Sequence, residues 1–497
     1  MVWVWREHIG HFRQASKAGY RCVANPGRIV YSEHSASNET NAMTRAGSFV
    51  ALMIFLAASV AGDASAQTPP APEPDASDPK TLTGNWGGLR DTLEKEHGVT
   101  LGLQEQSEVF GNLSGGLRRG TVYTGLTTAS VTLDLGTIAG WSDTTFMVSI
   151  IQNHGRGVTP NLVGNLQTIS NVEATRGTKL YNLWVEKSFL SGNLTIRVGQ
   201  EGANDELMLA KSAATFINSS FGYPALMAFG LPSGGPNYPL AAPMVRAQYK
   251  PDSRFTVIAA AFDGDPAGPG TNDPQIRDRT GTAFRLRDGV LGFLELWYAA
   301  GSDGEAGRPG TYKLGAWYHS GRFSDPLHDT TGQSLASPAS NGIARQYHGD
   351  QAVYAVMDQV VWRPYRDKNR GLSVFALGMT APDDRNFTSL FVQGGLNWAG
   401  PVAGRPKDVA GLALAYTNLG NAERRYGADL VRFGSASTPF RGHETIIELT
   451  YQYAVIPGLT LQPDVQYVIN PGAGVPNGQV SPLKNAVAAG MRATVVF

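Results

Sequence analysis

Apolar and polar residues alternate with a period of two from about residue 100 to the C-terminus. The last segment shows an apolar face made of Val487, Ala489, Met491, Ala493, Val495 and Phe497, with Gly490, Arg492 and Thr494 on the other face. Segments 443–453 and 459–469 repeat the pattern. Because successive side chains of a strand point to opposite faces, this alternation predicts two-faced β-strands. Helical periodicity is scarce, and it predicts one short amphipathic helix at 89–97.

Alternation alone would also fit a soluble β-sandwich, but three features favour a membrane barrel. Tyrosine and phenylalanine stand at the ends of apolar faces, as in an aromatic girdle. The polar faces are densely charged, as a water-filled lumen requires, and short connections alternate with long ones. The sequence therefore predicts an all-β fold, a transmembrane antiparallel β-barrel of about sixteen strands with a short N-terminal helix.

The predicted strands span 100–110, 122–135, 144–152, 179–188, 194–200, 244–250, 254–262, 280–299, 311–320, 352–362, 371–379, 389–398, 409–416, 443–453, 459–469 and 486–497. Asp288-Gly289 resembles a hairpin turn, but a split there would give an odd strand number. We therefore interpret 280–299 as one strand with a bulge, or as a strand preceded by loop residues. An even number leaves both termini on the periplasmic side, and a barrel of this size encloses an aqueous channel.

The N-terminal region carries the pattern of an export signal. Arg45 precedes an apolar run at 49–61, and Ala64-Ser65-Ala66 gives a cleavage pattern before Gln67. Thirteen apolar residues are too few for the alternative, a membrane-spanning anchor. We therefore expect a signal peptide at 43–66, an upstream segment at 1–42 that is not part of the real protein, a flexible linker at 67–83 and a barrel at 84–497.

Composition narrows the chemistry. The chain carries 41 basic and 41 acidic residues, so its charge gives no reason to expect a nucleic-acid partner. Its one cysteine, Cys22, excludes a disulfide framework and a cysteine zinc site. The histidines show no metal-ligand spacing, and the common nucleophile, phosphate and dinucleotide motifs are absent from the sequence. We expect no enzyme, no cofactor and no metal, although distant strands could still assemble a catalytic triad.

Four stretches resemble the carbohydrate-selective porins of the OprB family. They are GNWGGLR at 84–90, RPKD at 405–408, ETIIELTYQY at 444–453 and LQPDVQYVINP at 461–471. The resemblance implies a sixteen-stranded barrel in the bacterial outer membrane that passes glucose and other small sugars by passive diffusion. It also implies that the terminal Phe497 is read by the barrel-assembly machinery and that the barrel is surrounded by outer-membrane lipid.

Two long connections are candidates for narrowing the lumen. The connection at 201–243 holds the aromatic residues Phe216, Phe221, Tyr223 and Tyr238, and it carries little charge after Lys211. A loop of this length is usually functional or disordered, and we expect it to fold into the lumen. The alternative is an external cap over the barrel mouth. The loop at 153–178 is the second candidate.

Strand parity predicts which side chains line the pore. Tyr181, Leu183 and Val185 are expected to face lipid, so Trp184 and Glu186 face inward. The same argument turns Arg197 inward, directly opposite Glu186. An acid facing a base suits sugar hydroxyls, which donate and accept hydrogen bonds, and Trp184 could stack on a pyranose ring. Other residues predicted to face inward are Arg246, Gln248, Glu444, Glu448, Gln462 and Asp464.

The sequence leaves several alternatives open. Glu186 and Arg197 could merely neutralise each other in a wide lumen, and the other inward residues could supply only general polarity. The solutes could be other small hydrophilic compounds, such as carboxylates or aromatics, although the exported part has a net charge near −2, from 35 basic and 37 acidic residues. An outer-membrane enzyme is a third reading. The sequence leaves both monomer and trimer open.

Overall fold

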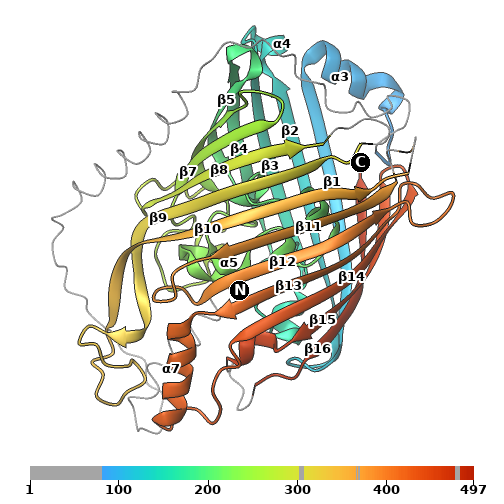
Figure 1. The fold of residues 1–497 in the computed structure, drawn as a ribbon. Coiled ribbons are helices and arrows are strands. Elements are labelled where there is room, and N and C mark those ends of the chain that lie inside the picture. Colours follow the sequence, from blue (N-terminus) through green and yellow to red (C-terminus); the bar gives the residue numbers. More distant parts are fainter. Residues whose placement is uncertain (1–80, 302–306, 365–366, 368–369, 476–481) are drawn as a thin grey trace.

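The computed structural model describes residues 81–301, 307–364, 367, 370–475 and 482–497, and within them sixteen antiparallel strands close into one barrel (Figure 1). Each strand pairs with its neighbours in the sequence, and β1 pairs with β16 to close the ring. The strands are β1 (Val99–Ser114), β2 (Gly120–Asp134), β3 (Thr144–Gly155), β4 (Gly177–Phe189), β5 (Leu194–Glu201), β6 (Ala242–Tyr249), β7 (Phe255–Asp263), β8 (Val290–Ala300), β9 (Gly310–Asp329), β10 (Ala344–Trp362), β11 (Gly371–Thr380), β12 (Thr388–Ala399), β13 (Val409–Leu419), β14 (His443–Ile456), β15 (Leu459–Ile469) and β16 (Ala486–Val496).

The predicted barrel and its strand number are confirmed. Of the two readings of 280–299, the second is correct, because β8 begins only at Val290 and the preceding residues form a loop. An Arg285–Asp288 ion pair lies in that loop, and Leu286 between them is 75% exposed. Closure leaves no strand edge unpaired, which a β-structure needs in hydrocarbon.

The helices lie at the two ends of the barrel and inside it. They are α3 (Leu89–His97), α4 (Leu135–Ala139), α5 (Ala225–Gly230), α6 (Pro274–Arg277) and α7 (Asn421–Arg432), with short 3₁₀ or π turns at Trp86–Gly88, Thr159–Val163, Leu190–Gly192, Ala203–Asp205, Lys211–Thr215, Ser219–Phe221, Pro232–Gly234 and Pro471–Gly474. The predicted helix at 89–97 is confirmed. In the part of the chain that the structure describes, no helix is long and apolar enough to cross a membrane.

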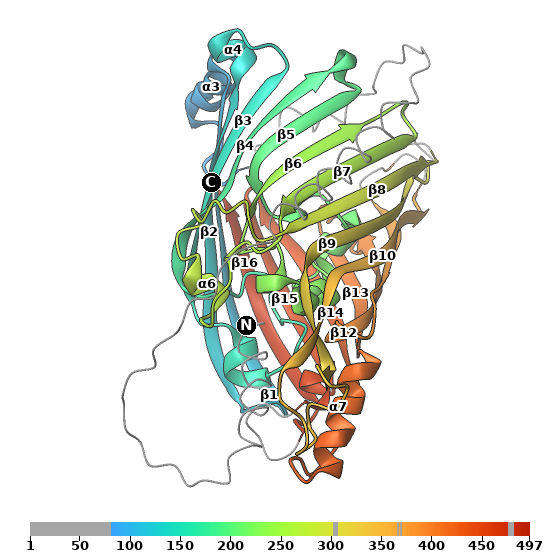
Figure 2. The same cartoon turned by 90° about the vertical axis from the view of Figure 1, so that its left-hand side faces the viewer.

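Short and long connections separate to opposite ends. Turns such as 190–193 and 457–458 lie at the end that carries α3 and α4 (Figures 1 and 2). Longer connections, including 156–176, 202–241 and 420–442, leave the other end, where α7 packs against the extended β9–β10 hairpin. The predicted alternation is confirmed for most strand pairs. The connections at 115–119 and 381–387 are exceptions, being short although they follow odd strands.

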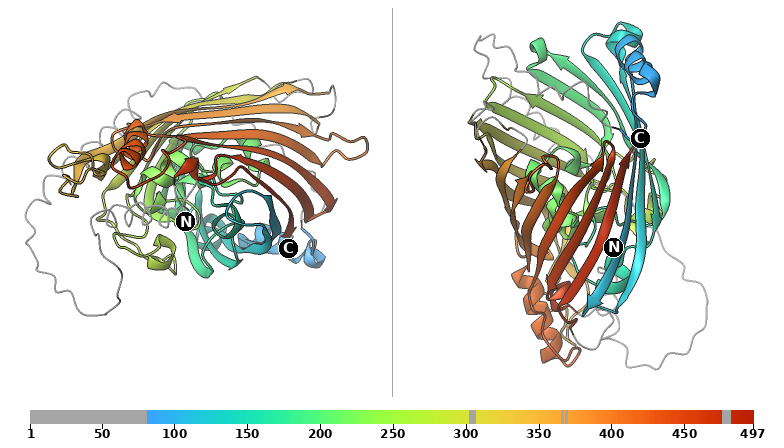
Figure 3. Two further views of the ribbon diagram at one scale, coloured as in Figure 1. Left: turned by 90° about the horizontal axis from the view of Figure 1, so that it is seen from below. Right: turned by 90° about the vertical axis from the view of Figure 1, so that its right-hand side faces the viewer.

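The main apolar core lies inside the ring of strands. Seen from below, the green segments of the 202–241 connection lie between the opposite walls of strands (Figure 3, left). Phe216 and Phe221 of this connection pack against Phe375 of β11, with ring centroids 5.6 and 6.1 Å from it. The outer face instead exposes large aliphatic side chains such as Leu314 and Val353. The connection therefore fills part of the lumen, which decides where a solute can pass.

Candidate functional site

Carboxylates on the inner wall hold the 202–241 connection, which we call the long inner loop. Glu448 of β14 accepts hydrogen bonds from the backbone N–H groups of Ile217 and Asn218 at 2.6 and 3.0 Å. Asp358 of β10 accepts from the N–H and hydroxyl of Ser212 at 2.6 and 2.8 Å. These contacts confirm that the loop folds into the lumen and exclude the external cap.

The 156–176 connection, the short inner loop, docks beside it. Glu444 lies four residues before Glu448 on the same inward face and accepts from the N–H groups of Leu166 and Gln167 at 2.8 and 2.7 Å. The two inner loops also bond to each other, from Asn171 N–H to the Ile217 carbonyl at 2.8 Å. One strand, β14, therefore positions both loops.

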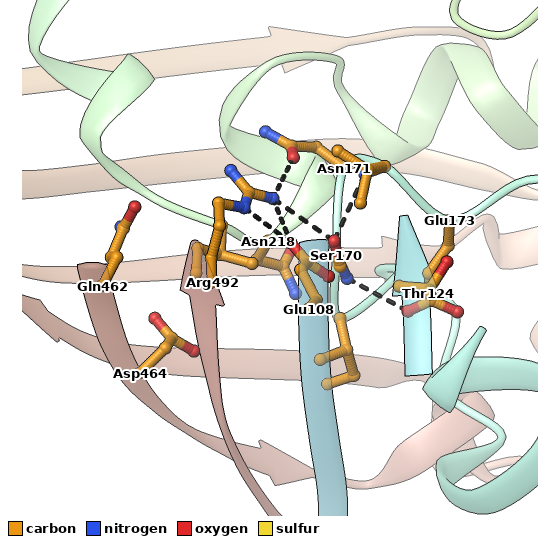
Figure 4. Close-up of polar contacts among 12 residues, drawn as sticks. Glu108, Thr124, Ser170, Asn171, Glu173, Asn218, Gln462, Asp464 and Arg492 are labelled. Atoms are coloured by element: carbon orange, nitrogen blue, oxygen red, sulfur yellow. Dashed lines mark hydrogen bonds and ion pairs between the residues drawn. The ribbon is translucent and has the colours of Figure 1, made fainter. Parts of the chain in front are cut away.

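A second anchor fixes the short inner loop at the closing seam of the barrel (Figure 4). Arg492 of β16 reaches Glu108 of β1, with an Nη2–Oε1 distance of 2.5 Å. The same guanidinium donates to Asn171 at 2.6 Å and to Ser170 at 3.3 Å. Because this ion pair is shielded from solvent, it holds the loop with little screening by salt.

A cavity of about 960 Å³ lies between the inner loops and the opposite wall. Strands β1 to β5 contribute the wall, with Gln106, Thr128 and Ser149 among its polar residues. Both inner loops supply the other side, including Arg156 at the start of the short one. This cavity is therefore eccentric, because it lies along β1–β5 rather than along the barrel axis.

Arg197 and Glu186 face each other on this wall. They are direct register partners on β5 and β4, and Arg197 Nη2 lies 2.9 Å from Glu186 Oε2. The Arg197 guanidinium also stacks over the Trp184 ring at 4.1 Å. The predicted facing pair is thus present in the geometry, and Trp184 and Arg197 line the cavity.

Arg246 extends the pair into a five-residue cluster. It is the register partner of Arg197 on β6, and its Nη1 lies 3.1 Å from Glu186. Glu206, from the long inner loop, accepts from Arg246 at 2.6 and 2.7 Å, and Glu201 bonds Arg197 at 2.8 Å. Two guanidinium groups therefore share three carboxylates, which explains how two arginines can stand side by side.

Glu448 and Asp464 point inward, as parity predicts, but they lie beneath the long inner loop rather than beside the arginines. Glu448 is fully buried and Asp464 is 2% exposed. Asp464 accepts a hydrogen bond from Gln466 at 3.0 Å. The structure does not bring these two acids together with Trp184, Glu186, Arg197 and Arg246.

The prediction that Tyr181 faces lipid is wrong. The register of β3 and β4 shifts between Val148 and Ile150, so that two residues of β4 stand opposite Ser149. This bulge turns Tyr181 inward, where its hydroxyl donates to Asp205 at 3.1 Å. Val185 lies beyond the bulge and faces outward as predicted, with 39% of its surface exposed.

Sequence reasoning missed the acids that the inner loops and the end of β5 contribute. Glu201 and Glu206 complete the arginine cluster, and Glu173 is buried where it accepts from Thr159 and Ser170. Burial raises the pKa of Glu173 to about 8 and that of Asp205 to about 6. The only signal in the sequence is a pair of acids five residues apart, one at the end of β5 and one just beyond it, and no local pattern shows which strand these acids contact.

Comparison with known proteins decides the family. Residues 118–497 match the model of the carbohydrate-selective porin, OprB family. The chain belongs to this family. It is 26% identical to Porin B of Pseudomonas aeruginosa over 435 residues, and this alignment covers 84% of this chain and 91% of that protein. It is also 24% identical to the putative porin QuiX of Acinetobacter baylyi, over 80% of this chain and 90% of that protein.

A solved structure shares the fold. The high-pH structure of Pseudomonas putida OprB superposes with a TM-score of 0.75 at 24% identity, over 86% of this chain and all of that one. The predicted family, barrel class and outer-membrane location are therefore confirmed, and this chain is a carbohydrate-selective porin.

Proposed function

We propose that small neutral sugars such as glucose diffuse passively through the cavity between strands β1–β5 and the two inner loops, touching the arginine cluster on the way. The observation that carries this proposal is the position of Arg197, which lines the cavity while it stacks on Trp184 and pairs with Glu186. A sugar hydroxyl can donate to a carboxylate and accept from a guanidinium at the same place.

The charge of the cluster supports a neutral solute. Two arginines face three glutamates, so the group carries a net charge of −1 when all five are ionised. A carboxylate solute would have to compete with Glu186, Glu201 and Glu206 for the guanidinium groups. A neutral polyol can use the free donor and acceptor positions without displacing any of them.

No covalent step belongs to this proposal. The solute crosses by diffusion, and the wall supplies hydrogen bonds that exchange with water. We also propose that residues 43–66 are removed as a signal peptide, with the mature chain beginning at Gln67. Those residues, the upstream segment 1–42 and most of the linker 67–83 lie outside the described residues.

The C-terminal residue is proposed to direct assembly. Phe497 ends the chain beside β1, where its N–H donates to the Leu103 carbonyl at 2.9 Å. Arg90, from the segment that resembles the family's N-terminal signature, donates to the Phe497 main-chain oxygen at 2.5 Å. A terminal aromatic at the closing seam is consistent with recognition by the barrel-assembly machinery.

Liposome swelling tests the proposed selectivity. Vesicles containing the purified porin should swell fast with monosaccharides and more slowly with carboxylates of similar size. Arg197→Ala should lower the swelling rate with monosaccharides by several-fold while the barrel stays folded on an unboiled gel. Equal rates for sugars and carboxylates in the wild type would refute the proposed selectivity.

A further inference from the structure

Basic and apolar side chains gather on the outer surface near the end with the long connections, and we call this group the outer basic patch. Its members are Phe284, Leu286, Arg287, Arg322 and His348. Phe284 and Leu286 are 52% and 75% exposed, and the three basic side chains are exposed as well. None of these five described residues lines the cavity, so the patch is separate from the proposed path of the sugar.

The patch forms where the 264–289 connection meets β9. The pairing of β9 with β8 ends well before β9 itself ends, and the connection lies beside the next part of the strand. A Cβ on Gly289 would lie 3.4 Å from the backbone nitrogen of Gly321, so the two segments touch at this point. Arg287 and Arg322 lie within two residues of this contact, one on each segment. Figure 2 shows the connection, with α6, on the side of the barrel that faces the viewer.

Buried neighbours fix the direction of Arg322. His319 and Phe323 of β9 are buried, and their rings meet edge to face with centroids 5.2 Å apart. These two residues lie on the inner side of the strand, so Arg322 between them points to the outside. His348 is the register partner of Arg322 on β10 and is exposed beside it.

An ion pair directs the apolar residues of the connection outward. Arg285 pairs with Asp288, and a Cβ on Gly268 would lie 2.5 Å from Arg285 Nε. The Arg285 side chain therefore lies against the connection itself. Phe284 and Leu286 flank Arg285 in the sequence and point the other way, which accounts for their exposure.

The depth of the patch matches the outer boundary of the hydrocarbon. Tyr312 lies on β9 at the end with short turns, where its ring centroid is 6.5 Å from that of Tyr298. Arg322 lies ten residues further along this strand, with the exposed Leu314 between them. A barrel strand crosses the hydrocarbon with about 9–11 residues, so Arg322 reaches the opposite interface. Long connections of outer-membrane barrels face the exterior, which places the patch in the outer leaflet.

The exposed charge at this place has one sign. Within segments 284–288, 320–324 and 343–348, the exposed ionisable residues are Arg287, Arg322, Arg345 and His348. The acid in the first segment, Asp288, is paired with Arg285. Arginine binds phosphate through two parallel N–H groups, which makes it well suited to phosphate recognition. Arginines beside exposed apolar side chains therefore suit a ligand that carries both phosphate and acyl chains.

We propose that the outer basic patch binds a phosphorylated glycolipid of the outer leaflet. Its phosphate binds Arg287 and Arg322, with His348 as a further donor beside them, and its acyl chains contact Phe284 and Leu286. Apolar contact and electrostatic attraction act together in such binding. A free phosphate ion could use the arginines, but it has nothing to place against the two apolar side chains.

Native mass spectrometry of the full chain in detergent tests the proposal, with bisphosphorylated lipid A as the probe. The wild type should retain the lipid, and the double variant Arg287→Ala/Arg322→Ala should bind it about tenfold more weakly. Arg254→Ala is the matched control, because Arg254 is an exposed arginine at the end with short turns. This control should bind as the wild type does. Equal affinities for the wild type and the double variant would overturn the proposal, as would an equal loss in Arg254→Ala.

Further measurements separate a lipid from a free anion. Leu286→Ser should weaken the binding of lipid A several-fold, and millimolar inorganic phosphate should leave the lipid bound. Unchanged binding in Leu286→Ser, or displacement of the lipid by phosphate, would assign the patch to free anions and overturn the lipid assignment. Unboiled gels should show that all variants fold. Liposome swelling with glucose should be unchanged in the double variant, so that this test is independent of the proposed path of the sugar.

Discussion

Glu448→Ala should loosen the long inner loop without unfolding the barrel. The substitution removes the acceptor for the N–H groups of Ile217 and Asn218, at 2.6 and 3.0 Å. Hydrogen bonds to charged groups contribute about 1.5–3 kcal/mol each, but the freed N–H groups regain water when the loop leaves the wall. The variant also removes one of two buried acids on neighbouring strands, since Asp464 of β15 lies two residues from Gln466, the register partner of Glu448.

The net loss in loop docking should therefore be about 2–3 kcal/mol, because these terms partly cancel. That loss raises the undocked fraction roughly 30- to 150-fold. Glu444, Asp358 and the aromatic packing of Phe216 still hold the loop in part. We expect a larger and noisier single-channel conductance, and swelling with disaccharides that the wild type passes slowly.

The control is Gln452→Ala on the same strand. Its amide makes one long hydrogen bond of 3.4 Å to the Thr215 carbonyl, so its loss should change the conductance little. Planar-bilayer recording and liposome swelling measure both variants. A wild-type conductance and size limit in Glu448→Ala would refute the inference that β14 positions the loop. An equal change in conductance in Gln452→Ala would show that the effect is not specific to the Glu448 contact.

Four further predictions concern the site, the N-terminus and the topology. Glu186→Gln should shift the planar-bilayer reversal potential toward anions, because the cluster loses one carboxylate while both arginines stay; an unchanged potential would mean that the pair contributes only general polarity. Burial raises the pKa of Glu173 to about 8 from an ordinary value of 4.5, so the docked short inner loop retains a proton that an undocked loop loses. Docking should thus weaken as pH rises from about 4.5 to 8, conductance should rise over that window, and Glu173→Gln should abolish the change; a variant that keeps the wild-type profile would assign it to another group. N-terminal sequencing of the exported protein should give Gln67 as the first residue. A tag inserted near Asn341 should be reachable from outside intact cells. A tag that is protected there would mean that the barrel has the opposite orientation in the membrane.

Strand positions and the direction of most side chains can be predicted from the sequence, because an alternation of apolar and polar residues both identifies a strand and assigns its two faces. Arg197 and Glu186 were placed opposite each other by counting residues across a short turn, and the register of β4 and β5 agrees. Counting failed at Tyr181, because a bulge adds one residue without leaving a mark in the pattern. The polar residues Glu105 and His154 on the outer face were likewise hidden within an alternating strand.

The loops could be predicted only in outline. Length and aromatic content indicated that the 202–241 connection enters the lumen, and its contacts with Glu448 and Asp358 agree. No local pattern shows that Glu206 would reach Arg246, since that contact joins a loop to a strand 40 residues away in the sequence. For the same reason, the sequence predicts that Glu448 faces inward but does not predict that the long inner loop buries it.

The route of the sugar is the central claim, and blocking by a tethered group tests it most directly. Thr128→Cys places a thiol on the cavity wall at β2, and Gln452→Cys places one on the inward face of β14, outside the cavity. After modification with a bulky thiol reagent, liposome swelling with glucose should fall several-fold for Thr128→Cys and remain at the unmodified rate for Gln452→Cys. Loss of glucose flux only in the modified Gln452→Cys porin would contradict a path along β1–β5.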